Sequence, residues 1–394
     1  MTSLTRPIAA IAAIAASSRL LAASALLAAV ATVAPLGAYA APALGTLGGS
    51  NITFEGLLQG DGNWYHEDVR ELDGRDDRDL AIRRADLLLR GTGPGPLDWV
   101  AGYDARGERW LDVNLRARFG RGDRHALQAG QFKHVNSLEE LSSTRSNDFI
   151  AKATVTTIYA IARRAGVGYG YAGDTAGLSF SAFDREITSG QATGRGSGAR
   201  VWWAPLHGGA QVLHVGAAYV TQDPGSAGTR VRARPNADLT NLRLVDAGQM
   251  DDARRIGTGS VEALWVRGPV KLQAEAFRST VERDAGPDFD SDGAYASAVW
   301  NLRGQGWGYR GGLPVTPVPG VGEPCRWQLA LRYDHIDLDD GAVRGGWQDA
   351  WTVGVNAYIG AHAKAMLNYV RIDSRRGGVD DDPAIFEARF QLHW

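Results

Sequence analysis

Cysteine, lysine and long apolar runs are scarce in this sequence of 394 residues. Its single cysteine, Cys325, excludes a disulfide within the chain. Beyond residue 40 no apolar run approaches the roughly 20 residues that a membrane helix needs. Lysine occurs only at positions 133, 152, 271 and 364, so arginine supplies most of the positive charge. The formal net charge of −2 gives the molecule no strong overall field, and nothing in it points to nucleic acid as a partner.

The first 40 residues differ from the rest of the chain. Two arginines precede the apolar stretch 20–33, and the small-residue site Ala38-Tyr39-Ala40 follows it. This order is typical of a cleaved export signal, although a membrane anchor helix is the alternative. We therefore expect a signal peptide over residues 1–40, a single domain over residues 41–394, and export to the envelope of a bacterium.

Short segments of alternating apolar and polar residues make up the rest. Residues 111–119 alternate in this way, and so do residues 385–394, which end on the aromatic Trp394. Such a strand has one apolar and one polar face, and closing a barrel removes the edges that would otherwise aggregate. The pattern predicts an all-β fold, a transmembrane antiparallel β-barrel of about 16 strands. The segments are 51–60, 80–91, 97–105, 111–119, 124–133, 165–171, 177–185, 198–204, 210–221, 257–267, 270–281, 292–302, 326–334, 349–359, 361–371 and 385–394.

Glycine, tryptophan and the connections agree with a barrel. Fifty glycines suit many turns, and 12 Trp with 12 Tyr suit two interfacial belts; a soluble sandwich or β-helix would share the glycine but less often the tryptophan. Connections 105–108 and 268–269 are tight, so we expect short turns on one rim and long loops on the other. The long connections are 63–79, 222–256, 303–324, 334–348 and 373–383.

Acidic runs occur in three of these loops, at residues 76–77, 339–340 and 380–382. Clustered carboxylates could ligate calcium, but such runs are more often solvated loop tips. We predict no metal site and no cofactor.

Three arginines alternate in residues 229–235. In an extended backbone Arg230, Arg232 and Arg234 share one face. Because guanidinium groups at this spacing repel one another, their alignment is unfavourable unless anions bind to them. Along a barrel wall they would form a track of weak oxyanion sites, whereas an exposed basic loop is the equal alternative.

Residues 131–164 contain a connection of about thirty residues between two strands. A loop of this length in a compact barrel is usually functional, and folding inward would make it a constriction loop that narrows the pore. A long external loop is the alternative.

Taken together, these residues resemble the phosphate-selective porin family of the O/P type. The resemblance runs in order from residue 82 to residue 394. The motifs that carry it include Ile82-Arg83-Arg84-Ala85, Tyr103-Asp104, Gly130-Gln131-Phe132-Lys133, Ser137-Leu138-Glu139-Glu140 with Ser142-Ser143, Ala204-Pro205-Leu206-His207, residues 230–235, Leu331-Arg332-Tyr333-Asp334 and Asn368-Tyr369-Val370.

This resemblance implies a homotrimer of sixteen-stranded barrels in the outer membrane, each with a pore in which a ladder of arginines leads to a narrow anion site. Carried over by position, the anion pathway would comprise Arg83, Arg84, Asp104, Arg145, Lys152, Arg230, Arg232 and Arg234. Arg83 and Arg84 are adjacent, so their side chains would point to opposite faces of a regular strand. We therefore expect a bulge or a turn there.

Glu140 departs from the family pattern, which has a lysine at this place in the loop. A carboxylate there would repel a phosphate dianion, by an amount on the order of a kcal/mol or more in a constricted pore. If Lys133 pairs with Glu140, the carboxylate is instead electrostatically quiet. Glu140 thus decides between a phosphate filter and a weaker anion preference.

The sequence therefore predicts a channel for passive diffusion of inorganic phosphate or other small anions, in contact with outer-membrane lipid and lipopolysaccharide. A general porin with weak or no ion selectivity is the alternative. A barrel enzyme is not indicated, because the eight histidines are scattered and none lies in a nucleophile motif. A receptor barrel would need an N-terminal plug domain, for which no segment is available.

Overall fold

The computed structural model describes residues 42–47, 49–66, 78–93, 95–188, 192, 194–208, 211–303, 306–319, 323 and 325–394. The expected signal peptide and the acidic pair at residues 76–77 lie outside this part of the chain. Within it, no helix is long and apolar enough to cross a membrane.

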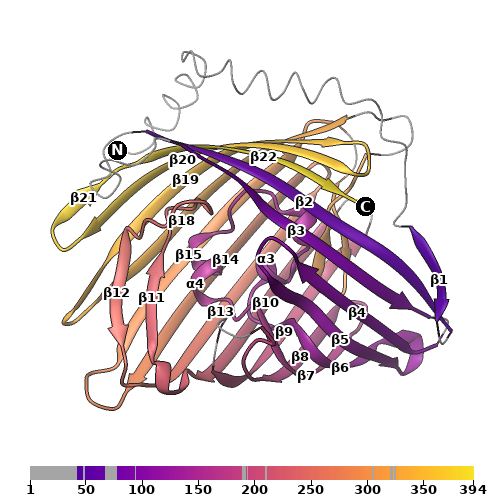
Figure 1. Cartoon of the computed structure of the whole chain (residues 1–394), viewed down its shortest axis with the longest axis horizontal. Coiled ribbons are helices and arrows are strands. Elements are labelled where there is room, and N and C mark those ends of the chain that lie inside the picture. Colours follow the sequence, from indigo (N-terminus) through magenta and orange to yellow (C-terminus); the bar gives the residue numbers. More distant parts are fainter. Residues whose placement is uncertain are drawn as a thin grey trace.

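Sixteen strands of the described chain close into one antiparallel barrel (Figure 1). The strands are β2 (Ser50–His66), β3 (Arg78–Thr92), β4 (Leu97–Asp104), β5 (Arg109–Phe119), β6 (His125–Lys133), β7 (Arg163–Ala172), β8 (Ala176–Phe183), β9 (Arg195–Gly208), β10 (Gln211–Asp223), β13 (Ala253–Arg267), β14 (Val270–Arg283), β15 (Phe289–Asn301), β18 (Cys325–Asp340), β19 (Val343–Ile359), β20 (Ala363–Arg376) and β22 (Ala384–His393). Each pairs with the next, and β22 returns to β2 in register from Leu57↔His393 to His66↔Ala384. Two short strands, β1 (Ala43–Leu47) and β21 (Val379–Asp381), pair antiparallel with β2 and β20. The predicted barrel and its strand number are confirmed.

Alternation along each strand separates the two faces of the wall. In β22 the side chains of Glu387, Arg389 and Gln391 are buried inside the barrel, while Phe386 and Phe390 lie on the other face. This separation is typical of a membrane barrel, in which apolar side chains face the lipid and polar side chains face the lumen.

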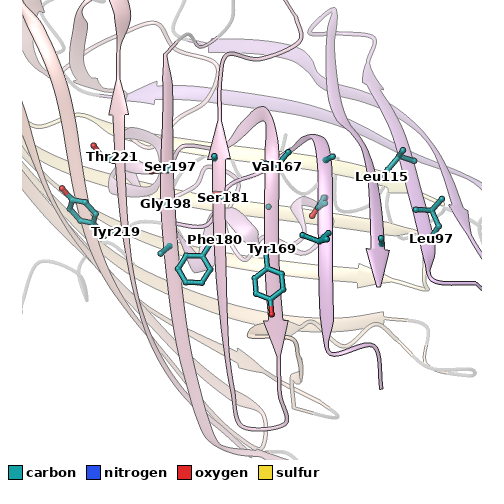
Figure 2. A pocket seen from close by; sticks show the side chains of 17 residues that line it. Leu97, Leu115, Val167, Tyr169, Phe180, Ser181, Ser197, Gly198, Tyr219 and Thr221 are labelled. Carbon is teal, nitrogen blue, oxygen red and sulfur yellow. The ribbon is translucent and has the colours of Figure 1, made fainter. Parts of the chain in front are cut away.

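The outer face of β4 to β10 carries a shallow apolar hollow of about 820 Å³. Figure 2 shows Leu115, Val167 and Phe180 among the side chains on these strands, and each of the three is about half exposed. Small residues between them, such as Gly198, leave the hollow open.

The connections differ from the expectation in two places. Because every strand pair is antiparallel, successive connections alternate between two rims. The rim where β13 joins β14 is called the turn rim, and the rim where β6 joins β7 the loop rim. The tight turn 105–108 therefore lies on the loop rim, and the long connection 302–324 on the turn rim, contrary to the prediction.

Another expected loop, 334–348, is mostly strand, since β18 and β19 pair as far as Asp340↔Val343. At the distal end of β18 the apolar residues Ile336 and Leu338 face inward, where they pack against the inserted segments, so the outward apolar alternation used for prediction is missing there.

Three segments fold into the barrel. The inner loop, residues 134–162, contains α3 (Leu138–Leu141), η3 (Thr144–Ser146) and α4 (Thr154–Tyr159), and Figure 1 shows both α-helices enclosed by the strands. Residues 224–252 contain η4 (Gly225–Ala227) and the hairpin of β11 (Thr229–Ala233) and β12 (Val245–Met250). Residues 306–319 contain β16 (Gly308–Arg310) and β17 (Leu313–Val315). A single-turn η2 (Arg121–Asp123) lies between β5 and β6.

Apolar contacts hold these segments against the inner wall. Val155 and Tyr159 of α4 pack with Val245 of β12 and with Phe277 and Ile336 of the wall. A second cluster joins residues of the 224–252 segment to wall strands β19, β20 and β22; its members are Ala237, Leu242, Leu244, Ala350, Val370, Ile372 and Ile385. The expected inward constriction loop is thus present, and the segment after β10 lies beside it.

Candidate functional site

Two carboxylates of the wall fix the helices of the inner loop. Both oxygens of Glu275 on β14 accept hydrogen bonds from the backbone N–H groups of Leu138 and Glu139, each at 2.8 Å. Asp334 on β18 accepts one from the N–H of Thr154 at 2.8 Å. These N–H groups belong to the first turns of α3 and α4, where no carbonyl of the helix can reach them.

The stretch between the helices, residues 145–151, is held through its backbone carbonyls. Five wall side chains donate to these carbonyls at 2.5–3.0 Å: Arg332, Asn356, Lys364, Arg389 and Gln391. Because the donors come from four strands, β18, β19, β20 and β22, the loop is fixed across one side of the lumen. These inward polar residues therefore hold the inner loop in place.

A cavity of about 250 Å³ lies between the inner loop, β3 and the 224–252 segment. Seven basic side chains line it: Arg83, Arg84, Arg109, Lys152, Arg163, Arg234 and Arg389. Three acidic side chains also line it: Glu140, Glu186 and Asp238. The cavity therefore has an excess of positive charge, although the whole chain does not.

A β-bulge brings both adjacent arginines into this cavity. The register between β2 and β3 shifts from Gln59↔Arg84 to Gly60↔Ile82, so Arg83 is the extra residue. A bulge places two neighbouring side chains on the same side of a strand. The expected irregularity at Arg83 and Arg84 is confirmed.

Carboxylates neutralise several of the lining cations. Arg83 binds Asp238 at 3.1 Å, and Arg389 binds both oxygens of Asp61, at 2.7 and 2.6 Å. Burial opposes ionisation of Asp238, but Arg83, Arg389 and Arg84 outweigh it and hold the pKa of Asp238 below its ordinary value.

Arg84 and Arg234 differ from these cations. Neither forms an ion pair with any described residue, and Nε of Arg234 is buried without a hydrogen-bond partner. A buried donor without a partner is costly, so a ligand or water at this place would complete it. Within the described lining, these two guanidinium groups are therefore the ones without a carboxylate in ion-pair contact.

Glu140 is closely paired. Its carboxylate contacts Nζ of Lys152 and lies 3.6 Å from Nζ of Lys133. Burial alone would raise its pKa, but Lys152 and Lys133 prevail and lower the pKa of Glu140 to about 2. Lys133 is fixed further by the backbone carbonyls of Glu140 and Ser142, at 2.5 and 3.1 Å. The alternative that Glu140 is electrostatically quiet therefore agrees with the geometry.

Two other predicted site residues lie outside the lining of the cavity. Arg145 binds Glu55 of β2 at 3.1 Å. Asp104 is buried and accepts hydrogen bonds from the backbone N–H groups of Ala85 and Arg106, at 3.3 and 3.1 Å. Asp104 thus fixes the tight turn after β4, and nothing in its contacts requires an anion.

The arginine triplet does not lie on the barrel wall. Arg230 and Arg232 are exposed on β11, which pairs only with β12, while Ala233 is buried. Arg230 binds Asp246 at 2.6 Å. Arg234 follows β11 and lines the cavity. The triplet therefore lies on an inserted hairpin that leads to the cavity, because the long connection after β10 folds back into the barrel.

Sequence reasoning missed several lining residues. Arg109, Arg163 and Arg389 lie at inward or terminal positions of wall strands, and Asp238 lies in the folded connection. Their alternation could have marked the strand residues as luminal, but only the closed barrel brings them together. No group of three or more His, Cys, Asp or Glu that could hold a metal ion occurs among the described residues.

A closed sixteen-stranded barrel with a loop folded into its lumen is the architecture of an outer-membrane porin. The sequence matches the family model described as phosphate-selective porin O and P over residues 58–394, and the chain belongs to this family.

The chain is also similar in sequence to two curated proteins and in fold to two solved structures. It is 30% identical over 335 residues to an uncharacterized protein of Caulobacter vibrioides, covering 78% of this chain and 66% of that protein. It is 27% identical over 224 residues to Porin O of Pseudomonas aeruginosa, covering 48% of this chain and 51% of Porin O. The chain thus spans just under two thirds of the first relative and about half of the second.

The solved structures share the fold. OmpT of Vibrio cholerae has a TM-score of 0.59 at 11% identity, covering 90% of this chain and 100% of OmpT. The anion-selective porin from Comamonas acidovorans has a TM-score of 0.57 at 15% identity, covering 88% of this chain and 100% of that porin. The family and the fold are those of a channel rather than an enzyme.

Proposed function

We propose that this porin lets small anions, inorganic phosphate above all, diffuse passively through an arginine-lined pore. The observation that carries the proposal is the pair of guanidinium groups, Arg84 and Arg234, that line the cavity and form no ion pair within 4 Å with any described carboxylate. The family description, which names phosphate selectivity, adds support, and so does the fold shared with the anion-selective porin from Comamonas acidovorans.

The chemistry of the lining suits a transient oxyanion. Guanidinium groups offer paired N–H donors that match two oxygens of a phosphate, and they remain charged at every working pH. Arg232 on the hairpin is exposed two residues before Arg234 and would raise the local anion concentration, whereas Arg230 is already paired with Asp246. Because nearby carboxylates screen most other cations, each anion would be held weakly enough to leave.

Lys152 and Glu140 have a secondary place in this proposal. Their mutual pairing removes the expected repulsion, but it also occupies the lysine that would otherwise face the anion. The binding of phosphate in the pore would therefore depend more on Arg84 and Arg234 than on Lys152 of the inner loop.

A general porin with weak selectivity is the second candidate. Three carboxylates line the cavity beside seven cations, and several of these cations are already paired. If water and both ion types passed the paired groups freely, the pore would show only a mild anion preference.

We further propose an exported homotrimer embedded in outer-membrane lipid and lipopolysaccharide, with residues 1–40 as its signal peptide. A trimer form of OmpT among the structural neighbours supports the assembly. The half-exposed apolar side chains on the outer face support contact with lipid (Figure 2).

The test is the reversal potential of the purified protein in planar bilayers under a chloride gradient, with phosphate then added to look for block. The variant is Arg84→Gln with Arg234→Gln. The matched control is Arg254→Gln with Arg278→Gln, which removes two exposed arginines that pair with rim carboxylates.

For the wild type and the control we expect the same anion-selective reversal potential and the same phosphate block. In the cavity variant, the ratio of anion to cation permeability should fall roughly thirtyfold, because the two removed charges contribute on the order of 1 kcal/mol each. Unchanged selectivity in the cavity variant would remove the two arginines from the filter. Weak selectivity of the wild type itself would favour the general porin.

A further inference from the structure

A short hairpin enters the lumen from the turn rim, opposite the inner loop. The insert, residues 306–319, contains β16 and β17, paired from Gly308↔Val315 to Arg310↔Leu313. Its Trp307 is buried in an apolar cluster with Leu138 and Phe149 of the inner loop. The inner loop and the insert therefore meet inside the barrel.

A second cavity, of about 330 Å³, lies where they meet. Ser142 and Asp148 of the inner loop line one side, and Arg310 and Val315 of the insert line the other. Asn147 lines both this cavity and the basic cavity described above, so the two spaces are neighbours. A solute that leaves the basic cavity past Asn147 would meet the insert next.

Hydrogen bonds attach the insert to the wall through His214 of β10. The Tyr309 hydroxyl lies 2.6 Å from Nδ1 of His214, and Nε2 of His214 lies 2.9 Å from Oε1 of Glu262. Arg200 binds the same carboxylate oxygen at 2.5 Å and donates to the carbonyl of Gly312 at 3.0 Å. This latch of four side chains thus begins and ends on the insert.

The latch is buried and closely packed. His214, Glu262 and Arg200 are each at most 5% exposed, so a group that lost its partner there would also lack water. Gly312 has a φ of +82°, and a Cβ at this place would lie 2.7 Å from the Trp202 ring. The backbone of the insert therefore approaches the wall too closely for a side chain.

From this arrangement we propose that the insert is a second constriction of the channel, which limits the size of the solutes that pass, and that Tyr309, His214, Glu262 and Arg200 are its positioning residues. The insert forms one wall of the space beyond the basic cavity, and the latch holds that wall in place. The proposal rests on the channel architecture alone and does not depend on which ion the pore prefers.

Two variants test it from opposite directions. Tyr309→Phe keeps the ring but removes the hydroxyl that contacts His214, and Val315→Trp adds bulk on the side of the insert that lines the second cavity. Tyr169→Phe is the matched control, because the Tyr169 hydroxyl lies 2.8 Å from Nδ1 of His125 and the side chain lines the hollow on the outer face (Figure 2).

The readouts are single-channel conductance, permeation of neutral sugars of increasing size into liposomes, and the reversal potential. Heat-modifiable migration in gels checks that each variant is a folded barrel. With Tyr309→Phe we expect a roughly fivefold larger fraction of time in a higher-conductance state, the shift expected when one buried hydrogen bond is lost. Larger sugars should also enter, and the reversal potential should stay unchanged.

Val315→Trp should lower the conductance and the sugar size limit, while Tyr169→Phe should match the wild type. If neither Tyr309→Phe nor Val315→Trp changes conductance or sugar permeation in folded protein, the insert lies off the pathway and the proposal is wrong. A changed reversal potential with an unchanged sugar limit would likewise contradict it, since the insert would then act on charge. Failure of the anion proposal alone would leave these sugar data untouched.

Discussion

Replacing Glu140 by Gln is expected to strengthen the anion preference of the channel. In the wild type this carboxylate is 6% exposed and is shared by Lys152 and Lys133. Glutamine has nearly the same shape but no charge, so at a pH where Lys133 and Lys152 stay protonated the substitution gives the basic cavity one more net positive charge. Lys133 keeps its backbone acceptors at Glu140 and Ser142, which limits rearrangement of the loop.

The size of the effect follows from Coulomb's law. One unit of charge about 7 Å from a passing anion, at an effective dielectric constant of about 40, contributes roughly 1 kcal/mol. This corresponds to an approximately fivefold change in affinity for a monovalent anion, and more for a phosphate dianion. The gain should shrink as salt is raised, because screening shortens the reach of the charge.

The assay compares Glu140→Gln with the wild type in planar bilayers, by reversal potential and by the phosphate concentration that halves the chloride current. A shift toward anions and a lower blocking concentration are expected. Glu139→Gln is a neighbouring control of equal charge change, although Glu139 faces the second cavity rather than the basic one. An unchanged or weaker anion preference in Glu140→Gln would contradict this prediction, since it would mean that the charges of Lys152 and Lys133 do not act on the permeating ion.

Two further predictions concern how the inner loop is held. Glu275→Ala removes the acceptor for two backbone N–H groups of α3, so we expect larger current fluctuations in single-channel records, whereas Glu282→Ala, at the exposed end of the same strand, should leave them unchanged. If the current fluctuations of Glu275→Ala are no larger than those of the wild type, apolar packing alone fixes the loop. The pKa of Glu140 is lowered from 4.5 to about 2, so its pairing stabilises the fold above about pH 4.5, and this contribution is lost as the pH falls toward 2. The difference in heat stability between the wild type and Glu140→Gln should therefore shrink as the pH falls from about 4.5 toward 2; a difference that does not change over this range would contradict the pairing.

The strands could be predicted because the surroundings of a barrel wall impose one rule along the whole chain. Residues 111–119 and 385–394 alternate so clearly that their strands were located almost to the residue. The rule fails where the apolar residues of a strand end face inward against the inserted segments, as Ile336 and Leu338 of β18 do. The continuation of β2 as far as His66 was missed because Gly60 and Gly62 leave its outer face without apolar side chains.

The candidate site was only partly predictable. The adjacency of Arg83 and Arg84 required an irregular strand, and the bulge follows from that local conflict alone. The triplet at residues 230–234 predicted an extended segment, but not that this segment belongs to an inserted hairpin. Nothing local to Arg83 indicates Asp238, which lies 155 residues further along the chain and neutralises it.

The fold class and the family follow from the amino-acid sequence alone, because period-two alternation and ordered motifs are local properties that do not depend on distant contacts. Which cations of the lumen lack an ion pair depends on the folded barrel, since pairing requires side chains brought together by barrel closure and by three inserted segments. Arg84 and Arg234 remain open to an anion, while Arg83, Arg389 and Lys152 are neutralised. In the sequence these five cations look alike; in the barrel the position of each carboxylate separates them, because electrostatic attraction depends on distance in space rather than on distance along the chain.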